Sequence, residues 1–224
     1  MKILFHGSSK IVDCPQFGKG NLRNDYGLGF YCTENLELAR EWACSNIRGG
    51  YANKYSLDLA KMEVLNLSAK EYNILNWISL LLNNRTFSVN NQVASEGKEY
   101  LIQNFMPNTN DFDVIIGYRA DDSYFAFAQD FLNNAISVKT LVRTMKLGNL
   151  GEQVVMKSKK AFEALSFENA EPVDGSLYFG KRQERDVQAR DDYLKKEKFN
   201  KMDSDDFFLI DILRRQIKQN DIEF

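Results

Sequence analysis

Short β-prone segments that alternate with helical segments constrain this fold more than any other feature of the sequence. The apolar run at residues 3–5 ends at His6-Gly7, and GFYCT at residues 29–33 leads directly into a helical pattern at residues 34–45. Further strands are expected at residues 51–59, 62–67, 114–116 and 152–158. With helices between these strands, the sequence predicts the α+β class.

Helix signals fill the intervals between the strands. Thr33 is the expected N-cap of the helix at 34–45, and the spacing of Ser68 and Glu71 predicts a capping box in front of the next helix, at residues 72–85. That helix is apolar nearly all round, so it is expected to be buried. The other helices are expected at residues 97–106, 123–136 and 137–148, with Gly148 as a C-cap, and within residues 159–167.

From about residue 172 the chain becomes dense in charges of both signs. We therefore expect two parts, a domain at residues 1–171 and a charged helical extension at residues 172–224. Leu209, Leu213 and Ile217 recur at helical spacing, which predicts one apolar stripe on the last helix of that extension.

Charge and composition restrict the partner and the compartment. The 29 Lys and Arg residues are balanced by 31 Asp and Glu residues, so the net charge of −2 favours neither nucleic acid nor an anionic membrane as a general partner. With one histidine and an odd number of cysteines, no metal site is expected, and a reducing compartment is indicated. Neither a signal peptide nor a membrane span is recognised, so we expect a cytoplasmic protein without a membrane partner.

Three short motifs near the N-terminus carry chemistry. His6-Gly7-Ser8 follows the first strand, GLGFYCT at residues 27–33 contains Tyr31, and the following helix places Trp42 eleven residues beyond Tyr31. In this order and spacing, the motifs resemble the ADP-ribosyltransferase superfamily, in its diphtheria-toxin-like and poly(ADP-ribose)-polymerase-like branch. The resemblance covers about residues 1–168, and it implies two small, mostly antiparallel sheets split around an NAD cleft.

The resemblance gives each of these residues a contact with NAD. His6 would hydrogen-bond the ribose on the nicotinamide side, and Gly7 would offer its backbone to the carboxamide, which requires that no side chain hold the ligand away. Tyr31 and Trp42 would sandwich the flat cationic ring, at roughly 0.5–2 kcal/mol per contact. His6 and Tyr31 are thus implied catalytic residues.

One position departs from the polymerase-like pattern. That pattern has a small hydroxyl residue on the helix to hold the carboxamide, and here the matching residue is Ala39. Ser8, Ser9 and Thr33 are the candidates to replace it, and Ser8 is counted with the NAD-binding residues.

The third element of these enzymes is a Glu, Asp or Gln on a later strand. Because neighbouring residues of a strand face opposite sides, only one of Glu152 and Gln153 in EQVVMKS can enter the cleft. Glu152 fits the polymerase-like pattern, whereas Gln153 fits a closer, little-characterised bacterial set of transferase-like proteins. A carboxylate could polarise the acceptor, whereas an amide positions groups by hydrogen bonds. Both stay catalytic candidates, with Gln153 preferred.

A second polar turn, GYRADDSYF at residues 117–125, ends another apolar strand. Arg119 is expected to meet the NAD pyrophosphate, and Asp121 or Asp122 to hold an acceptor or a ribose. The structural alternative is an Arg–Asp pair with a helix cap from Asp122 or Ser123.

The resemblance implies an enzyme that transfers mono-ADP-ribose from NAD to a protein or nucleic-acid acceptor while nicotinamide leaves. Small bacterial members of the superfamily often act as toxins or defence effectors, so an antitoxin or other regulatory protein is an implied partner. Two alternatives stay open. One is an NAD glycohydrolase that uses water as the acceptor, and the other is a non-catalytic module that binds a nucleotide or a partner.

Overall fold

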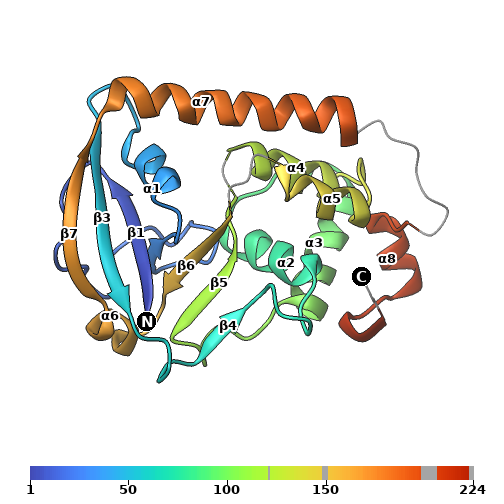
Figure 1. Ribbon diagram of the computed structural model, residues 1–224. Coiled ribbons are helices and arrows are strands. Elements are labelled where there is room, and N and C mark those ends of the chain that lie inside the picture. The colour runs from blue at the N-terminus through green and yellow to red at the C-terminus, as the bar shows by residue number, and fades with distance from the viewer. Residues whose placement is uncertain (121, 148–150, 198–205, 222–224) are drawn as a thin grey trace.

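Two sheets organise the computed structural model, which describes residues 1–120, 122–147, 151–197 and 206–221 (Figure 1). The first sheet is antiparallel, in the order β1-β3-β7, and the second has the order β2-β6-β5-β4, in which β4 and β5 pair in parallel. The strands are β1 (Lys2–Ser8), β2 (Phe30–Cys32), β3 (Gly50–Leu57), β4 (Val64–Asn66), β5 (Val114–Tyr118), β6 (Glu152–Met156) and β7 (Ser166–Val173). The α+β class and the two mostly antiparallel sheets expected from the sequence are therefore present.

Helices lie on both outer sides of the two sheets. They are α1 (Leu36–Ala43), α2 (Ile74–Asn84), α3 (Gln92–Phe105), α4 (Asp122–Leu132), α5 (Val138–Thr144), α6 (Lys159–Ala164), α7 (Gly175–Asp192) and α8 (Leu209–Arg215), with a π-helical turn η2 (Tyr193–Glu197) and a 3-10 turn η3 (Gln219–Asp221). Helix α2 is buried along most of its length, as the apolar pattern on all of its faces predicts.

Strand alternation sorts the side chains into three layers of core. Leu4 of the first sheet packs with Val114 and Met156 of the second, so the two sheets share a core between them. On the outer face of the first sheet, Ala52 packs against Ala39 of α1. The outer face of the second sheet packs on α2, α3, α4 and α5 and forms the largest core cluster.

Among the described residues, one isolated backbone pair joins the two sheets along one edge. Phe5 of β1 donates to the oxygen of Thr33 at 2.7 Å, and Thr33, just after β2, donates to the oxygen of Phe5 at 2.9 Å. This bridge fixes β1 beside β2, which places the His6 motif and the Tyr31 motif next to each other.

Two predicted helix caps are wrong. The N-cap of α1 is Asn35, whose side chain accepts from the backbone of the first turn, because Thr33 is engaged in the bridge to Phe5. The capping box of α2 is formed by Asn73 and Asn76 rather than by residues 68–71. Gly148 lies outside the described residues.

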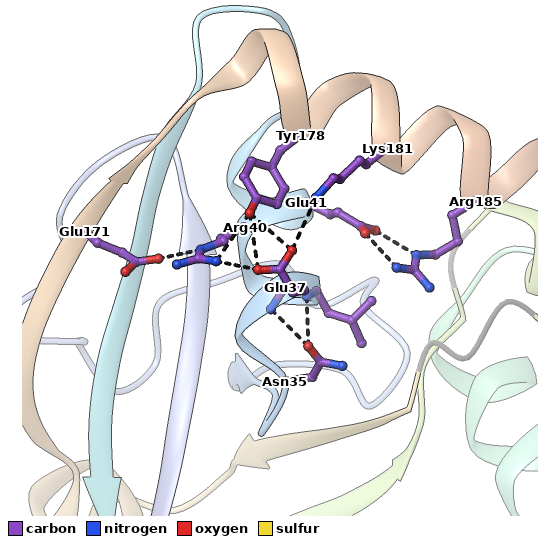
Figure 2. Close-up of polar contacts among 9 residues, drawn as sticks. Asn35, Glu37, Arg40, Glu41, Glu171, Tyr178, Lys181 and Arg185 are labelled. Carbon is purple, nitrogen blue, oxygen red and sulfur yellow. Dashed lines mark hydrogen bonds and ion pairs between the residues drawn. The ribbon is translucent and has the colours of Figure 1, made fainter.

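Helix α7 lies across α1 and α4 (Figure 1). Figure 2 shows that ion pairs hold it on α1: Arg185 of α7 binds the carboxylate of Glu41, which is 4% exposed, and Lys181 pairs with Glu37. Glu37 also accepts from Arg40 of its own helix and from Tyr178 of α7. The charged residues of α7 therefore make tertiary contacts with α1.

The C-terminal helices also contribute to the core of the second sheet. Tyr193, Leu209, Ile212 and Ile217 belong to the largest core cluster. The predicted apolar stripe on the last helix is partly wrong. Helix α8 ends at Arg215, and Gln216 takes a left-handed backbone conformation. Ile217 is buried, but it lies after the end of the helix. The division at residue 171 stays a prediction, and β7 crosses it.

Across the described ranges, no helix is both long and apolar enough to cross a membrane. The three cysteines are free thiols, of which Cys14 is exposed and Cys32 and Cys44 are buried.

Candidate functional site

A cavity of about 240 Å³ is lined by side chains from both sheets and from the helices beside them. Its lining is His6, Gly7, Asn24, Asp25, Tyr31, Trp42, Arg85, Arg119, Ala120 and Gln153. A second hollow, of about 640 Å³, shares His6, Asn24 and Tyr31 with this cavity, so the two adjoin. Residues that are far apart in the sequence and were singled out there thus meet at one place.

His6 presents a hydrogen-bond acceptor to this cavity. Its Nδ1 lies 2.7 Å from the main-chain oxygen of Tyr31. Because a carbonyl oxygen only accepts, Nδ1 carries the proton, and Nε2 of the neutral ring keeps a free lone pair. Burial lowers the pKa of His6, which favours the neutral ring, and the imidazole packs on Phe30 with the ring centroids 4.4 Å apart.

The hydroxyl of Tyr31 is occupied by its own loop. It donates to the oxygen of Gly27 at 2.5 Å and accepts from the backbone nitrogen of Tyr26 at 3.1 Å. Burial strongly raises the pKa of Tyr31, so the phenol stays protonated. The ring, and not the hydroxyl, is therefore the part of Tyr31 that is left to contact a ligand.

Gly7 is required by helix packing. A Cβ atom on Gly7 would lie 2.0 Å from the oxygen of Ala39 and 2.6 Å from the nitrogen of Ala43, both in α1. Helix packing therefore gives a reason for this glycine that is separate from the one the resemblance implies, and the contact of Gly7 with a ligand stays a prediction. The close approach of α1 to β1 brings Trp42 to the cavity.

Trp42 is partly covered by Arg119. The guanidinium carbon of Arg119 lies 4.0 Å from the centroid of the indole ring, in a cation–π contact. Arg119 therefore lines the cavity, but it packs on Trp42, one of the two aromatic rings that the resemblance places against nicotinamide. Its contact with the NAD pyrophosphate stays a prediction. The indole Nε1 of Trp42 is buried, and within the described ranges it has no hydrogen-bond partner, so it is an unsatisfied donor beside the cavity.

Of the two candidates on β6, Gln153 lines the cavity. Gln153 is 4% exposed, and its Nε2 donates to Oδ2 of Asp25 at 2.9 Å. Glu152 points elsewhere: it accepts from the hydroxyl of Ser68 and lines a separate hollow with Thr33. The strand register between β2 and β5 produces this difference, because it sets which face of β6 each residue occupies.

Of the remaining predicted site residues, Ser8 is not among those that line the cavity. The hydroxyl of Ser8 donates to the oxygen of Lys10 and accepts from Asn53, so it belongs to the turn after β1. Asp121 lies outside the described residues. Asp122 begins α4, and its side chain is also outside what the structure describes.

Asp25 is the main site residue that sequence reasoning missed. Asp25 is 5% exposed, and three donors converge on its carboxylate. Arg85 donates to Oδ1 at 2.9 Å, and the backbone N–H of Ala120 and the side-chain amide of Gln153 donate to Oδ2, each at 2.9 Å. Burial raises the pKa of Asp25, whereas these donors and Arg119 act to lower it. No local signal distinguishes it from the exposed Asp13, because both lie in the long polar loop between β1 and β2.

In the part of the chain that is described, no three His, Cys, Asp or Glu residues lie together as metal ligands. The cavity instead offers two acceptors, His6 Nε2 and Gln153 Oε1, and the side chains of Arg85 and Arg119 are part of its lining. This set suits a polar organic ligand that carries hydroxyl groups.

A family model described as "Protein of unknown function (DUF3990)" matches residues 2–167. The matched span contains all of the cavity lining and ends within β7, before α7 and α8. No curated protein and no solved structure matches the chain.

Proposed function

The chain belongs to the DUF3990 family of proteins of unknown function, and we propose that it is an NAD-dependent mono-ADP-ribosyltransferase that modifies a protein or nucleic-acid acceptor. The observation that carries the proposal is that His6, Tyr31, Trp42 and Gln153 line one cavity, although they come from four separate elements. Packing in the core would explain buried aromatic rings, but it does not require that they line one cavity together with His6 and the amide of Gln153. The resemblance of these motifs to the ADP-ribosyltransferases supplies the reaction.

The arrangement of the sheets supports the same proposal. The resemblance implies two mostly antiparallel sheets split around an NAD cleft, and here two such sheets meet at the Phe5–Thr33 bridge beside the cavity. The adjoining hollow of about 640 Å³ gives room for the ADP part of NAD beyond the smaller cavity.

The chemistry required of the site is breakage of the bond between nicotinamide and ribose. Nicotinamide leaves with the bonding electron pair, the acceptor nucleophile bonds to the anomeric carbon, and the acceptor loses a proton. His6 Nε2 and Gln153 Oε1 are both suited to accept hydrogen bonds from ribose hydroxyls. The oxygen dipole of Gln153 also faces positive charge favourably, so it would stabilise an oxocarbenium-like transition state more than the ground state.

No carboxylate beside the ribose is required by this proposal. Asp25 is the nearest buried acid, and it is already bound by three donors. With an amide as the third site residue, activation of the acceptor is left to the acceptor itself or to another residue, which favours transfer to a single site over the building of chains.

The test is incubation of the purified protein with labelled NAD and cell extract. Wild type is expected to label a macromolecule and to release nicotinamide, and Gln153→Ala and His6→Ala to abolish both. Glu152→Ala is the matched control, since it changes the neighbouring residue on the opposite face of β6 and should retain labelling. Tyr31→Phe, which keeps the ring and removes the loop contacts of the hydroxyl, should retain more activity than Tyr31→Ala.

The alternatives give different outcomes in the same assay. Release of nicotinamide with free ADP-ribose and no labelled macromolecule identifies an NAD glycohydrolase. Absence of nicotinamide release together with an unchanged melting temperature in NAD refutes the proposal and leaves a non-catalytic module.

A cytoplasmic toxin or defence role, restrained by an inhibitory protein, is part of the proposal. It predicts that expression of wild type arrests growth and that expression of Gln153→Ala at equal level does not. Equal toxicity of the two would refute this role.

A further inference from the structure

We infer that Asp25 is a positioning residue that fixes the polarity of the third site residue: its carboxylate binds the Gln153 amide nitrogen and leaves the amide oxygen for a substrate hydroxyl. The inference rests on the proposed function for the identity of the substrate. The polarity of the Asp25–Gln153 pair, however, is a property of the folded chain and can be measured without any substrate.

The first step is the orientation of the Gln153 amide. An amide has one donor end and one acceptor end, and either could face Asp25. An ionised carboxylate only accepts, so the 2.9 Å contact with Asp25 Oδ2 must come from Nε2 of Gln153. The carbonyl oxygen Oε1 is then the end that remains for a ligand in the cavity.

The second step is that Asp25 is held in the ionised, accepting state. Arg85 donates to Oδ1, and the backbone N–H of Ala120 donates to Oδ2 beside the Gln153 contact. Both carboxylate oxygens thus already accept hydrogen bonds from these donors. A proton on either oxygen would weaken such a bond, so protonation of Asp25 is disfavoured. Burial raises the pKa of Asp25, and the donors from Ala120 and Arg85, together with the charge of Arg119, oppose that shift and favour the anion.

A purely structural role accounts for other contacts of Asp25. Its main-chain oxygen accepts from Nδ2 of Asn84 at 3.0 Å, and Oδ1 pairs with Arg85. These two contacts would hold the loop before β2 without any involvement of Gln153. The contact between Oδ2 and Gln153 is therefore the feature that links this loop to β6 and to the chemistry.

The consequence concerns what the cavity can recognise. Gln153 Oε1 and His6 Nε2 are both acceptors, so the preferred ligand group is a pair of hydroxyl donors, as in a ribose diol. If the amide were reversed, the site would present a donor, and it would suit a carbonyl or a phosphate oxygen instead.

The direct test measures side-chain amide exchange by NMR on the ¹⁵N-labelled protein without ligand. The Gln153 side-chain signals are assigned by their loss in Gln153→Ala. We expect one Hε2 proton to exchange at least about tenfold more slowly than that of Gln188, which is exposed on α7. We expect Asp25→Asn to abolish that protection, because the asparagine amide can donate to Oε1 and reverse the pair. Equal exchange for Gln153 and Gln188 in wild type would overturn the inference.

The kinetic arm separates positioning from loop stability. Asp25→Asn is expected to lower kcat for nicotinamide release by about tenfold or more, with KM for NAD changed less than about threefold, because the lost contact acts mainly in the transition state. Asn84→Ala removes a hydrogen bond to the same residue and lies outside the cavity lining, so it should leave kcat nearly unchanged. An equal loss of kcat in both variants would mean that Asp25 acts through the loop alone, which contradicts the inference.

The two proposals fail in different ways. If wild type releases no nicotinamide from NAD, the proposed function is wrong, and the exchange experiment still decides the polarity of the pair. If wild type is active but the Gln153 amide is unprotected, the function stands and the role of Asp25 is refuted.

Discussion

The Nδ1 atom of His6 lies 2.7 Å from the main-chain oxygen of Tyr31, and this side-chain contact replaces a backbone pair. After Phe5 and Thr33, the next hydrogen-bonded pair of an antiparallel ladder would be Gly7 and Tyr31. The imidazole takes the Tyr31 oxygen instead, and Gly7 lies opposite Ala52 of β3 on the other edge of β1. The ladder between the two sheets stops here, at residues that line the cavity.

The pKa of His6 should lie below the ordinary value of 6.5, because burial disfavours the charged ring more than the Tyr31 contact favours it. His6 is the single histidine of the chain, so one imidazole NMR signal reports its titration. Between the folded pKa and 6.5 the unfolded state binds more protons, so the free energy of unfolding should rise with pH in that window. His6→Gln should flatten the rise, and a midpoint at or above 6.5 would contradict the expectation.

Gly7→Ala should destabilise the protein and disturb the cavity. Its Cβ would meet backbone atoms of α1, which cannot give way without moving the helix, so we expect a loss of about 1–3 kcal/mol in the free energy of unfolding. Gly180→Ala in α7 is the control, since nothing lies within 4 Å of its added Cβ, and a gain of about 0.5–1 kcal/mol is expected. Denaturant unfolding of both variants checks the pair, and similar changes in the two would refute the packing argument.

Arg185→Met should cost about 3–5 kcal/mol of unfolding free energy, because it leaves the Glu41 carboxylate buried without its bidentate partner. Figure 2 shows both hydrogen bonds of this pair. Lys195→Ala breaks an exposed pair with Asp191 and should change stability by at most about 0.5 kcal/mol. Equal effects in denaturant unfolding would mean that α7 does not depend on the buried pair.

Gln153→Glu should make stability fall with rising pH. A glutamate there would face the Asp25 carboxylate at the present 2.9 Å contact, so like-charge repulsion raises the pKa of the introduced group in the folded state. The folded state then binds more protons, and the free energy of unfolding should be lower at pH 8 than at pH 5 by about 1–3 kcal/mol more than in wild type. Adding Asp25→Asn should remove most of that extra slope, and a slope unchanged from wild type in Gln153→Glu would show that the two side chains are not in contact.

The sequence determined the local elements of this protein. Alternating β-prone and helical segments predicted most of the strands and helices, because apolar periodicity is a short-range property that survives without tertiary contacts. It also singled out His6, Tyr31 and Trp42 from their order and spacing, through the resemblance to a known superfamily.

The tertiary structure decided which side chains share the cavity. Gln153 faces it and Glu152 does not because β6 pairs between β2 and β5 in one register, and a shift of one residue would exchange the two. Asp25 became visible only when its partners from β6 and from the segment after β5 were placed around it. Contacts between residues about 100 positions apart depend on the packing of whole sheets and helices, and no local pattern encodes them.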